Sequence, residues 1–297
     1  MTTESISTKP AMFEVYDDWA DLYDRTVGSD YGRGQFEFLK RVLLPHLPVR
    51  ARILDLCCGT GQLFRPLIDL GYRVTGLDSS AEMLARASQN APEAECVHDD
   101  ARTFCRPNHF DAAISTSASL NHIPTIDDLQ QIFRRIAVSL TDNGMFVFDL
   151  NHPAQLTKWW RGDACEGDID DGWAWMITPY YDADVRQGKF RLTVFQSTKD
   201  GDTARRSISI LKRPVYACLR CDRFVGLRLK TLQSFERFEP TWERTEVDFP
   251  IFGHDLTDVR DALIQAGFSD VNTETIDGGQ EIDANHSAHF ICRKGDR

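Results

Sequence analysis

The sequence predicts an α/β protein in which a doubly wound, mostly parallel sheet is interrupted by an inserted antiparallel β subdomain. Strand-like and helix-like segments alternate as far as residue 150, as expected when helical crossovers join parallel strands. From residue 151 apolar and polar residues alternate with period two, which is typical of antiparallel strands with one solvated face. The helical period returns after Pro250. We therefore expect one α/β domain from residues 1–154 and 251–297, with residues 155–250 as the inserted subdomain.

The spacing of apolar residues assigns the elements of the first half. Helices are expected at residues 36–43, 63–70, 80–87 and 129–140, and strands at 51–56, 72–77, 110–115 and 145–150. Ser79 or Ser80 can cap the third helix, because a serine hydroxyl accepts a hydrogen bond from the first helical turn. Gly71 and Gly144 mark the ends of the second and fourth helices.

Apolar residues two apart define the strands expected in the insertion. These strands fall at residues 190–194, 208–210, 225–229 and 247–251, with a hairpin turn at 199–202. Beyond the insertion, a helix from Leu256 to Ala266 is stopped by Gly267, and strands follow at 268–276 and 288–292.

The charge and composition exclude several classes of protein. With 34 Lys+Arg against 45 Asp+Glu, the net charge is −11, which argues against broad binding to nucleic acid or to an anionic membrane. There is no run of about 18 apolar residues and the N-terminus is polar, so neither a membrane span nor a secretion signal is expected. The eight cysteines are too sparse for a disulfide scaffold. These features predict a cytoplasmic protein with reduced thiols.

A glycine-bearing turn follows the first expected strand. Gly59 and Gly61 permit a tight turn and close approach of a ligand, and Asp78 at the end of the next strand can accept both hydroxyls of a ribose. Dinucleotide binding requires a third glycine, but that position is Phe64. Asp55 at the mouth of the turn would repel a pyrophosphate and would suit an ammonium group. A cofactor with a ribose and a cationic amino-acid tail fits both acids.

At these residues the chain resembles the class I S-adenosylmethionine-dependent methyltransferases, over residues 12–151 and from 255 onward. The segment Leu54-Asp55-Leu56-Cys57-Cys58-Gly59-Thr60-Gly61 follows the family pattern, with Cys57 where glycine is usual. The resemblance implies a Rossmann-like methyltransferase sheet and S-adenosyl-L-methionine as cofactor. It also implies the following cofactor contacts: Asp55 for the ammonium; Tyr23, Gly59 and Gly61 for the methionine tail; Asp78 for the ribose; Met83, Asp100 and Ala101 for the adenine; and Ser115 near the sulfonium. Cys57 and Ser79 are expected to bind the cofactor as well.

The candidate catalytic residues are His122 and Tyr16. A neutral imidazole can accept a proton from an incoming amine or hydroxyl, although such a histidine can also serve only to bond a neighbouring carbonyl. The stretch Leu120-Asn121-His122 and the opening Tyr16-x-x-x-Ala20-x-x-Tyr23-Asp24 resemble the small-molecule branch that includes nucleotide-sugar N,N-dimethyltransferases and glycine N-methyltransferases. In that branch, this histidine and the first tyrosine lie beside the acceptor. Both tyrosines also fit a plain helix-packing stripe.

The insertion is locally basic. Between Lys199 and Arg237 ten basic residues stand against four acidic ones, a balance of +6 that leaves −17 for the rest of the chain. This patch can receive a phosphorylated or nucleotide-linked substrate, or it can be a solvated sheet face. Five of the six tryptophans lie in or beside the insertion, where they can form a lid over the substrate or an interface with a second subunit in a homodimer.

No metal site is expected. Cys218 and Cys221 lack a second ligand pair, and on an extended strand their side chains would face opposite sides.

Together, the glycine turn, the two acids and the resemblance predict methyl transfer from S-adenosylmethionine to a small-molecule acceptor, an amine in preference to a hydroxyl. The alternatives are an RNA methyltransferase that docks through the basic insertion and a non-catalytic protein that binds S-adenosylmethionine for regulation.

Overall fold

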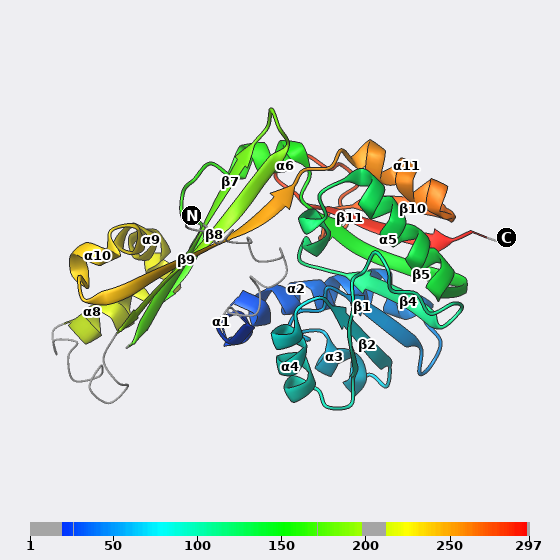
Figure 1. The fold of residues 1–297 in the computed structure, drawn as a ribbon, viewed down its shortest axis with the longest axis horizontal. Helices are drawn as coiled ribbons and strands as arrows, with labels where there is room; N and C mark the ends of the chain where they lie inside the picture. Colours follow the sequence, from blue (N-terminus) through cyan, green and yellow to red (C-terminus); the bar gives the residue numbers. More distant parts are fainter. Residues whose placement is uncertain (1–19, 26, 171, 198–211, 296–297) are drawn as a thin grey trace, which may run out of the picture. The chain divides into compact units, whose positions relative to one another are not determined.

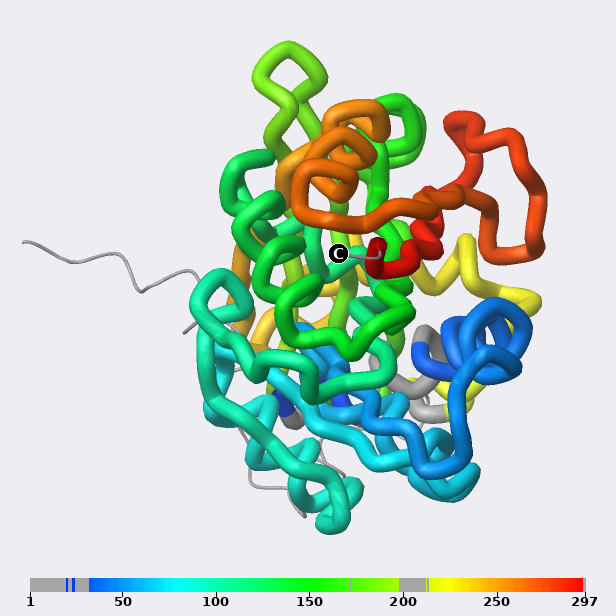
Figure 2. Tube along the Cα trace, turned by 90° about the vertical axis from the view of Figure 1, so that its right-hand side faces the viewer, coloured from blue at the N-terminus to red at the C-terminus, as the bar shows by residue number. Residues whose placement is uncertain are grey.

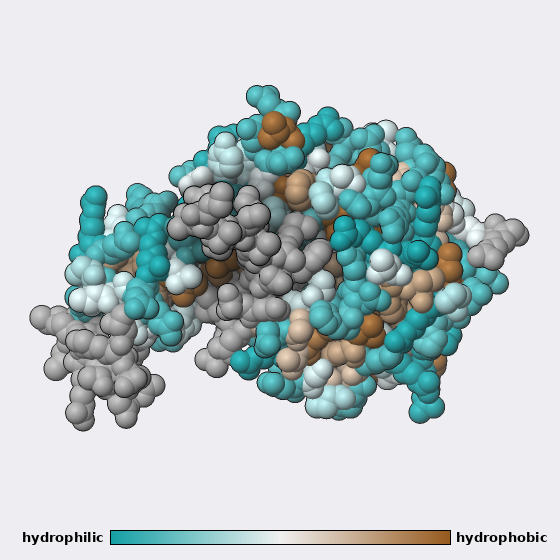
Figure 3. Space-filling model, viewed as in Figure 1, coloured by the Kyte–Doolittle hydropathy of each residue, from teal (hydrophilic) through white to brown (hydrophobic). Residues whose placement is uncertain are grey.

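The computed structural model describes residues 20–25, 27–170, 172–197 and 212–295. The chain divides into two compact units, one formed by Met1–Gln155 with Phe252–Arg297 and the other by Leu156–Ile251. Among the described residues no helix is long and apolar enough to cross a membrane. On the face drawn in Figure 3, the described surface is mostly hydrophilic, with apolar side chains in small groups.

Within the described residues, the first unit is built on a seven-stranded sheet in the order β10-β11-β5-β4-β1-β2-β3 (Figure 1). The strands are β1 Arg52–Leu56, β2 Arg73–Asp78, β3 Glu95–His98, β4 Phe110–Ser115, β5 Leu140–Leu150, β10 Phe268–Glu274 and β11 Ala288–Lys294. Strands β1 to β5 pair in parallel, and β11 runs antiparallel to both β5 and β10. This mostly parallel sheet confirms the predicted fold class.

Helices cover both faces of this sheet (Figure 1). They are α1 Ala20–Arg25, α2 Val27–Val42, α3 Phe64–Asp69, α4 Ala81–Asn90, α5 Ile126–Ser139 and α11 Leu256–Ala266, with the short helices η2 Leu44–His46 and η3 Ser119–His122. On one face α2, α3 and α4 bury Leu39, Phe64 and Leu84 against the sheet. On the other face α5 and α11 bury Phe133 and Leu263. The loop between β10 and β11 is the orange-to-red excursion in Figure 2.

The ends of these helices follow the sequence signals. Ser80 is the cap of α4, because its side chain accepts the hydrogen bond from Met83 N at 3.1 Å. Gly267 ends α11 with φ +106°, a conformation that favours glycine. Strand β3 was not predicted from the sequence, since its four residues are only partly buried and carry no alternating apolar pattern.

The second unit contains the strands β6 Glu166–Ile169, β7 Trp173–Asp182, β8 Gln187–Ser197 and β9 Trp242–Phe252, which form a sheet in that order. Strands β6, β7 and β8 pair antiparallel. On β9, Asp248 accepts hydrogen bonds from Lys189 and Arg191 of β8. The described helices of this part are α6 Pro153–Trp159, α8 Lys212–Leu219, η4 Asp222–Phe224, α9 Val225–Gln233 and α10 Phe235–Phe238.

The strand expected at residues 225–229 is wrong, because these residues begin helix α9. Leu229, Leu232 and Phe235 recur at helical spacing and pack into one cluster, whereas Leu227 of the supposed apolar face is 55% exposed. A short apolar run of this kind does not distinguish strand from helix by its period alone. Cys218 lies in the last turn of helix α8 and Cys221 directly precedes η4, so neither is on a strand, and both are exposed. The strand expected at 208–210 and the turn at 199–202 lie outside the described residues.

Candidate functional site

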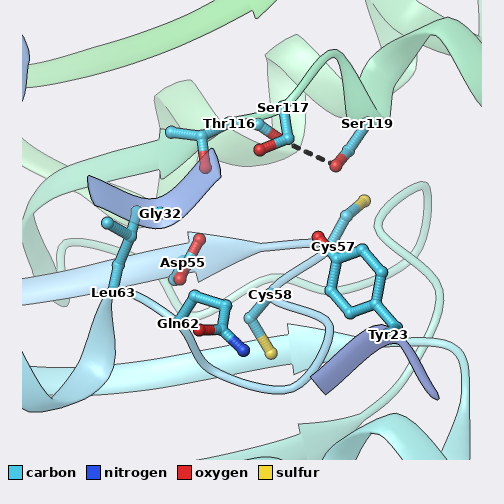
Figure 4. A pocket seen from close by; sticks show the side chains of 10 residues that line it. All are labelled: Tyr23, Gly32, Asp55, Cys57, Cys58, Gln62, Leu63, Thr116, Ser117 and Ser119. Atoms are coloured by element: carbon cyan, nitrogen blue, oxygen red, sulfur yellow. Dashed lines mark hydrogen bonds between the residues drawn. The ribbon is translucent and has the colours of Figure 1, made fainter. Parts of the chain in front are cut away.

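A pocket of the first unit lies at the carboxyl ends of β1 and β4 (Figure 4). It is lined by Tyr23, Gly32, Asp55, Cys57, Cys58, Gln62, Leu63, Thr116, Ser117 and Ser119. The residues come from five segments: α1, α2, the end of β1, the turn after β1 and the loop after β4. In open α/β sheets, ligands bind at this edge of the strands.

The turn after β1 requires glycine. Gly61 has φ +74°, and a Cβ at this position would lie 2.7 Å from the Phe64 ring. Gly59 has φ +53° and donates its N–H to Asp78 Oδ2 at 2.8 Å. Cys57, the departure from the family pattern, adopts φ +53° although it carries a side chain. The turn therefore keeps a glycine-like backbone at Cys57 at the cost of local strain.

Asp55 is a buried carboxyl group at the floor of the pocket. Burial, reinforced by the nearby charge of Asp78, raises the pKa of Asp55 from 3.8 to about 8. No salt bridge to Asp55 is found among the described residues. A ligand cation placed beside Asp55 would restore its ionised form, so the site suits the ammonium of S-adenosylmethionine.

Asp78 is held by the backbone around it. Its Oδ2 accepts from Gly59 N and its Oδ1 accepts from Ser80 N at 2.9 Å. Burial raises the pKa of Asp78, and these hydrogen bonds oppose the rise. A carboxylate has about four lone-pair sites, so two acceptor positions remain for ribose hydroxyls. Ser79 contributes its carbonyl to the His98 ring at 2.9 Å, which fixes the strand end beside Asp78.

Helix α1 is fixed against the glycine turn by Asp24. Its Oδ1 accepts hydrogen bonds from Gln62 Nε2 at 3.0 Å and from Asn90 Nδ2 at 2.7 Å. The neighbouring Tyr23 consequently faces the turn, and a Cβ on Gly59 would lie 3.6 Å from its ring. Figure 4 shows this ring beside the two cysteines of the turn. The structure thus brings Tyr23 together with Asp55, Cys57, Gly59 and the rest of the turn.

The residues expected at the adenine lie on neighbouring elements, outside the pocket lining. Met83 is buried in the first turn of α4, and Ala101 packs partly buried after β3. Asp100 is engaged by Arg102, whose guanidinium is the main cause that lowers the pKa of the Asp100 carboxyl. Ser115 is fully buried at the end of β4, and the following Thr116, Ser117 and Ser119 form the pocket wall in its place.

His122 ends the short helix η3, three residues after Ser119 of the pocket wall, and is partly buried. It does not belong to the residues that line the pocket. Tyr16, the other candidate catalytic residue, lies outside the described residues.

Three residues that sequence reasoning did not select hold the loop after β4. Asn121 donates to the carbonyls of Asn151 and Phe252 at 2.9 and 2.8 Å and accepts from Asn151 N at 2.8 Å. The His254 ring bonds the carbonyl of Ile123 at 2.9 Å. Asp149 Oδ2 accepts from Ala118 N at 2.9 Å. Asp149 could have been found from the sequence, because a polar residue stands at the end of a buried strand.

Part of the positive charge of the insertion is neutralised inside the second unit. Arg220 pairs with Asp168 and Asp170, and Lys212 pairs with Glu239. Lys199, Arg205 and Arg206 lie outside the described residues. Since none of the described basic residues from Lys212 to Arg237 lies on a strand, the expectation of a charged sheet face is wrong for them.

Comparison with known proteins agrees with this geometry. Residues 53–144 match a family model described as a methyltransferase domain. A dTDP-3-amino-3,6-dideoxy-alpha-D-glucopyranose N,N-dimethyltransferase of Streptomyces fradiae is 33% identical over 144 residues, which cover 48% of this chain and 53% of that protein. A dTDP-3-amino-3,4,6-trideoxy-alpha-D-glucopyranose N,N-dimethyltransferase of Streptomyces venezuelae is 26% identical over 202 residues, covering 66% and 76%.

A solved structure extends the likeness over nearly the whole chain. The SAM-bound amino pentose methyltransferase CalS10 of Micromonospora echinaspora superposes with a TM-score of 0.60 at 15% identity, covering 99% of this chain and 100% of that one. The glycine turn with its two acids and the family match over residues 53–144 support a class I S-adenosylmethionine-dependent methyltransferase, and the solved structure agrees with this fold. Within this class its sequence resembles the nucleotide-sugar N-methyltransferases. The chain spans about half the length of several curated relatives, including the S. fradiae protein.

Proposed function

We propose that this protein transfers a methyl group from S-adenosylmethionine to an amine on a small molecule, of the class of nucleotide-linked amino sugars. The observation that carries the cofactor part is the buried Asp55 at the floor of a glycine turn in which the Gly59 N–H donates to Asp78. The acceptor class is supported by the relatives, which are named for methylating amino sugars on dTDP.

The residues that would hold the cofactor follow from the geometry of the turn. Asp55 binds the ammonium, Gly59 and Gly61 let the methionine tail approach the backbone, and Asp78 binds the ribose. Met83, Asp100 and Ala101 border the adenine. When bound, the cofactor supplies an already activated methyl group on its sulfonium.

The chain then has to align the acceptor and to keep its nitrogen unprotonated. Thr116, Ser117 and Ser119 form one wall of the pocket in which this alignment would take place. His122, at the end of η3, is the residue we assign to removing the proton that the amine loses. Tyr16 is assigned to the acceptor side as well.

For the inserted unit, Leu156–Ile251, we propose one of two roles: a lid over the acceptor or an interface with a second copy of the chain. Trp175 and Trp242 are buried within it, whereas Trp159 is 57% exposed. Light scattering distinguishes the roles, because only the interface predicts a dimer that dissociates when this unit is altered.

The acceptor is tested with methyl-labelled S-adenosylmethionine and three probes: dTDP-3-amino-3,6-dideoxy-α-D-glucopyranose, its 3-hydroxy counterpart and bulk RNA. We expect label in the amino sugar and none in the hydroxy sugar. Label in RNA alone would overturn the small-molecule proposal, and binding of the cofactor without any transfer would favour the regulatory alternative. The variant Asp78→Ala is the matched negative control, because it should lose cofactor affinity.

A further inference from the structure

Asp149 is a buried acid at the carboxyl end of β5 that the proposed reaction does not use. The residue is only 4% exposed, and its Oδ2 accepts the hydrogen bond from Ala118 N at 2.9 Å. The nearby backbone of Ser117 also lowers the pKa of this carboxyl, against the rise that burial causes. Within the described part of the chain, Oδ1 has no hydrogen-bond partner. Asp149 therefore directs its bonded oxygen at the backbone of the loop that forms the pocket wall.

That loop adopts a backbone conformation that its residues disfavour. Ser117 and Ala118 are consecutive non-glycine residues with φ of +63° and +56°. Each such residue costs on the order of 1 kcal/mol and persists only where its surroundings hold it. The hydrogen bond from the Ala118 amide to the Asp149 carboxylate stabilises this conformation, since hydrogen bonds to a charged acceptor are about twice as strong as neutral ones.

The conformation of Ser117 and Ala118 affects the shape of the pocket. Ser117 and Ser119 line it, the Ser119 hydroxyl donates to Thr116 O at 2.8 Å, and η3 begins directly after Ala118. The position of this loop thus determines both the wall of the pocket and the start of the helix that ends at His122.

We propose that Asp149 is a positioning residue for methyl transfer, whose carboxylate holds residues 116–119 in the shape of the pocket wall. The inference rests on the proposed function, because the wall matters for transfer only if transfer occurs there. Its structural part, the anchoring of the loop, can be measured without any acceptor.

The first test is amide hydrogen exchange of residues 117–121 in the protein saturated with S-adenosylhomocysteine. Asp149→Asn should lower the protection of these amides about tenfold, because a charge-assisted bond is replaced by a neutral one. The matched control is Asp111→Asn: Asp111 Oδ2 also accepts a backbone N–H, from Arg52 at 2.8 Å, but near the amino end of β4. Equal protection of residues 117–121 in the two variants would overturn the proposal.

A second test uses the unaltered protein and so does not depend on the folding of a variant. Burial raises the pKa of Asp149 to about 7, so the protection factors of residues 117–121 should fall as the pH is lowered from 8.5 to 6. Other titratable groups that face this region are His289, the register partner of Asp149 on β11, and the Arg41–Glu274 ion pair beyond it. Asp55 lines the pocket, and His122 lies three residues after Ser119 of the pocket wall. His289→Asn should therefore leave the fall in place, and a fall that disappears with it would assign the effect to His289.

The functional arm measures turnover of dTDP-3-amino-3,6-dideoxy-α-D-glucopyranose. In Asp149→Asn we expect kcat to fall 10- to 100-fold while KM for S-adenosylmethionine stays within threefold. A rise in that KM with unchanged kcat would overturn the positioning role. If the unaltered protein fails to methylate any amine, the proposed function fails, and the exchange experiments alone then decide whether Asp149 anchors the loop.

Discussion

The affinity for the cofactor should depend on pH through Asp55. In the free protein, burial and the charge of Asp78 raise the pKa of Asp55 to about 8, so the carboxyl keeps its proton at neutral pH. Binding of an ammonium group beside it requires the ionised form. The proton must therefore leave when the ligand binds, and binding must weaken as the pH falls below the pKa of the free protein.

The size of this effect follows from that pKa. Each pH unit below this pKa weakens cofactor binding by about 1.4 kcal/mol. Because Asp55 is already half ionised at pH 8, the Kd at pH 6 should exceed the Kd at pH 8 by about 50-fold. At pH 7, binding should release about 0.9 proton. Over this range the ammonium keeps the bound carboxylate ionised.

Isothermal titration calorimetry with S-adenosylhomocysteine measures both quantities. This ligand keeps the ammonium and the ribose, and buffers of different ionisation enthalpy report the released protons. Asp55→Asn is the control, because it has no proton to release and should bind weakly with little pH dependence. A Kd that changes less than twofold between pH 6 and 8 in the unaltered protein would refute the reasoning.

Four further outcomes are expected from the same geometry. Without ligand, the raised pKa of Asp55 contributes stability that is present below its unfolded value of 3.8 and is lost as the pH rises towards 8, so Tm should fall over this range in the unaltered protein and less in Asp55→Asn. Gly61→Ala should unfold more easily than Gly71→Ala by about 1–3 kcal/mol in urea, because both have positive φ but only Gly61 faces the Phe64 ring; equal losses would contradict this. Cys57→Gly should raise the free energy of unfolding by up to about 1 kcal/mol by relieving the strain at φ +53°, and a loss of stability would argue against that strain. His122→Ala should slow label transfer at least about 100-fold while cofactor affinity stays within threefold, and an unchanged rate would remove it as the base.

Much of the first unit could be predicted from the sequence because its elements are long and periodic. The strand at residues 110–115 and the α5 stripe match the structure, since buried strands and amphipathic helices leave clear apolar periods. The glycine turn at the cofactor site could also be predicted from the sequence, because glycines and acids at fixed spacing indicate the backbone geometry directly. In contrast, the strand predicted at residues 225–229 was wrong, because a short alternating run of apolar residues is also compatible with a partly exposed helix such as α9.

The supports of the site were harder to predict. Asn121 occurred in a stretch selected for its histidine, but its bonds reach Asn151 and Phe252, which are distant in sequence. Asp149 acts through the backbone of Ala118, 31 residues away. Contacts of this kind depend on the order of the strands in the sheet. A local sequence pattern does not predict which loop the end of a strand will face.

The most direct test of the account is the mass of dTDP-3-amino-3,6-dideoxy-α-D-glucopyranose after incubation with the protein and methyl-labelled S-adenosylmethionine. The account predicts an increase by one or two labelled methyl groups on the sugar nitrogen, matched by S-adenosylhomocysteine formation and lost in Asp78→Ala. An unmodified amino sugar, with label appearing in RNA or on a hydroxyl acceptor, would contradict it.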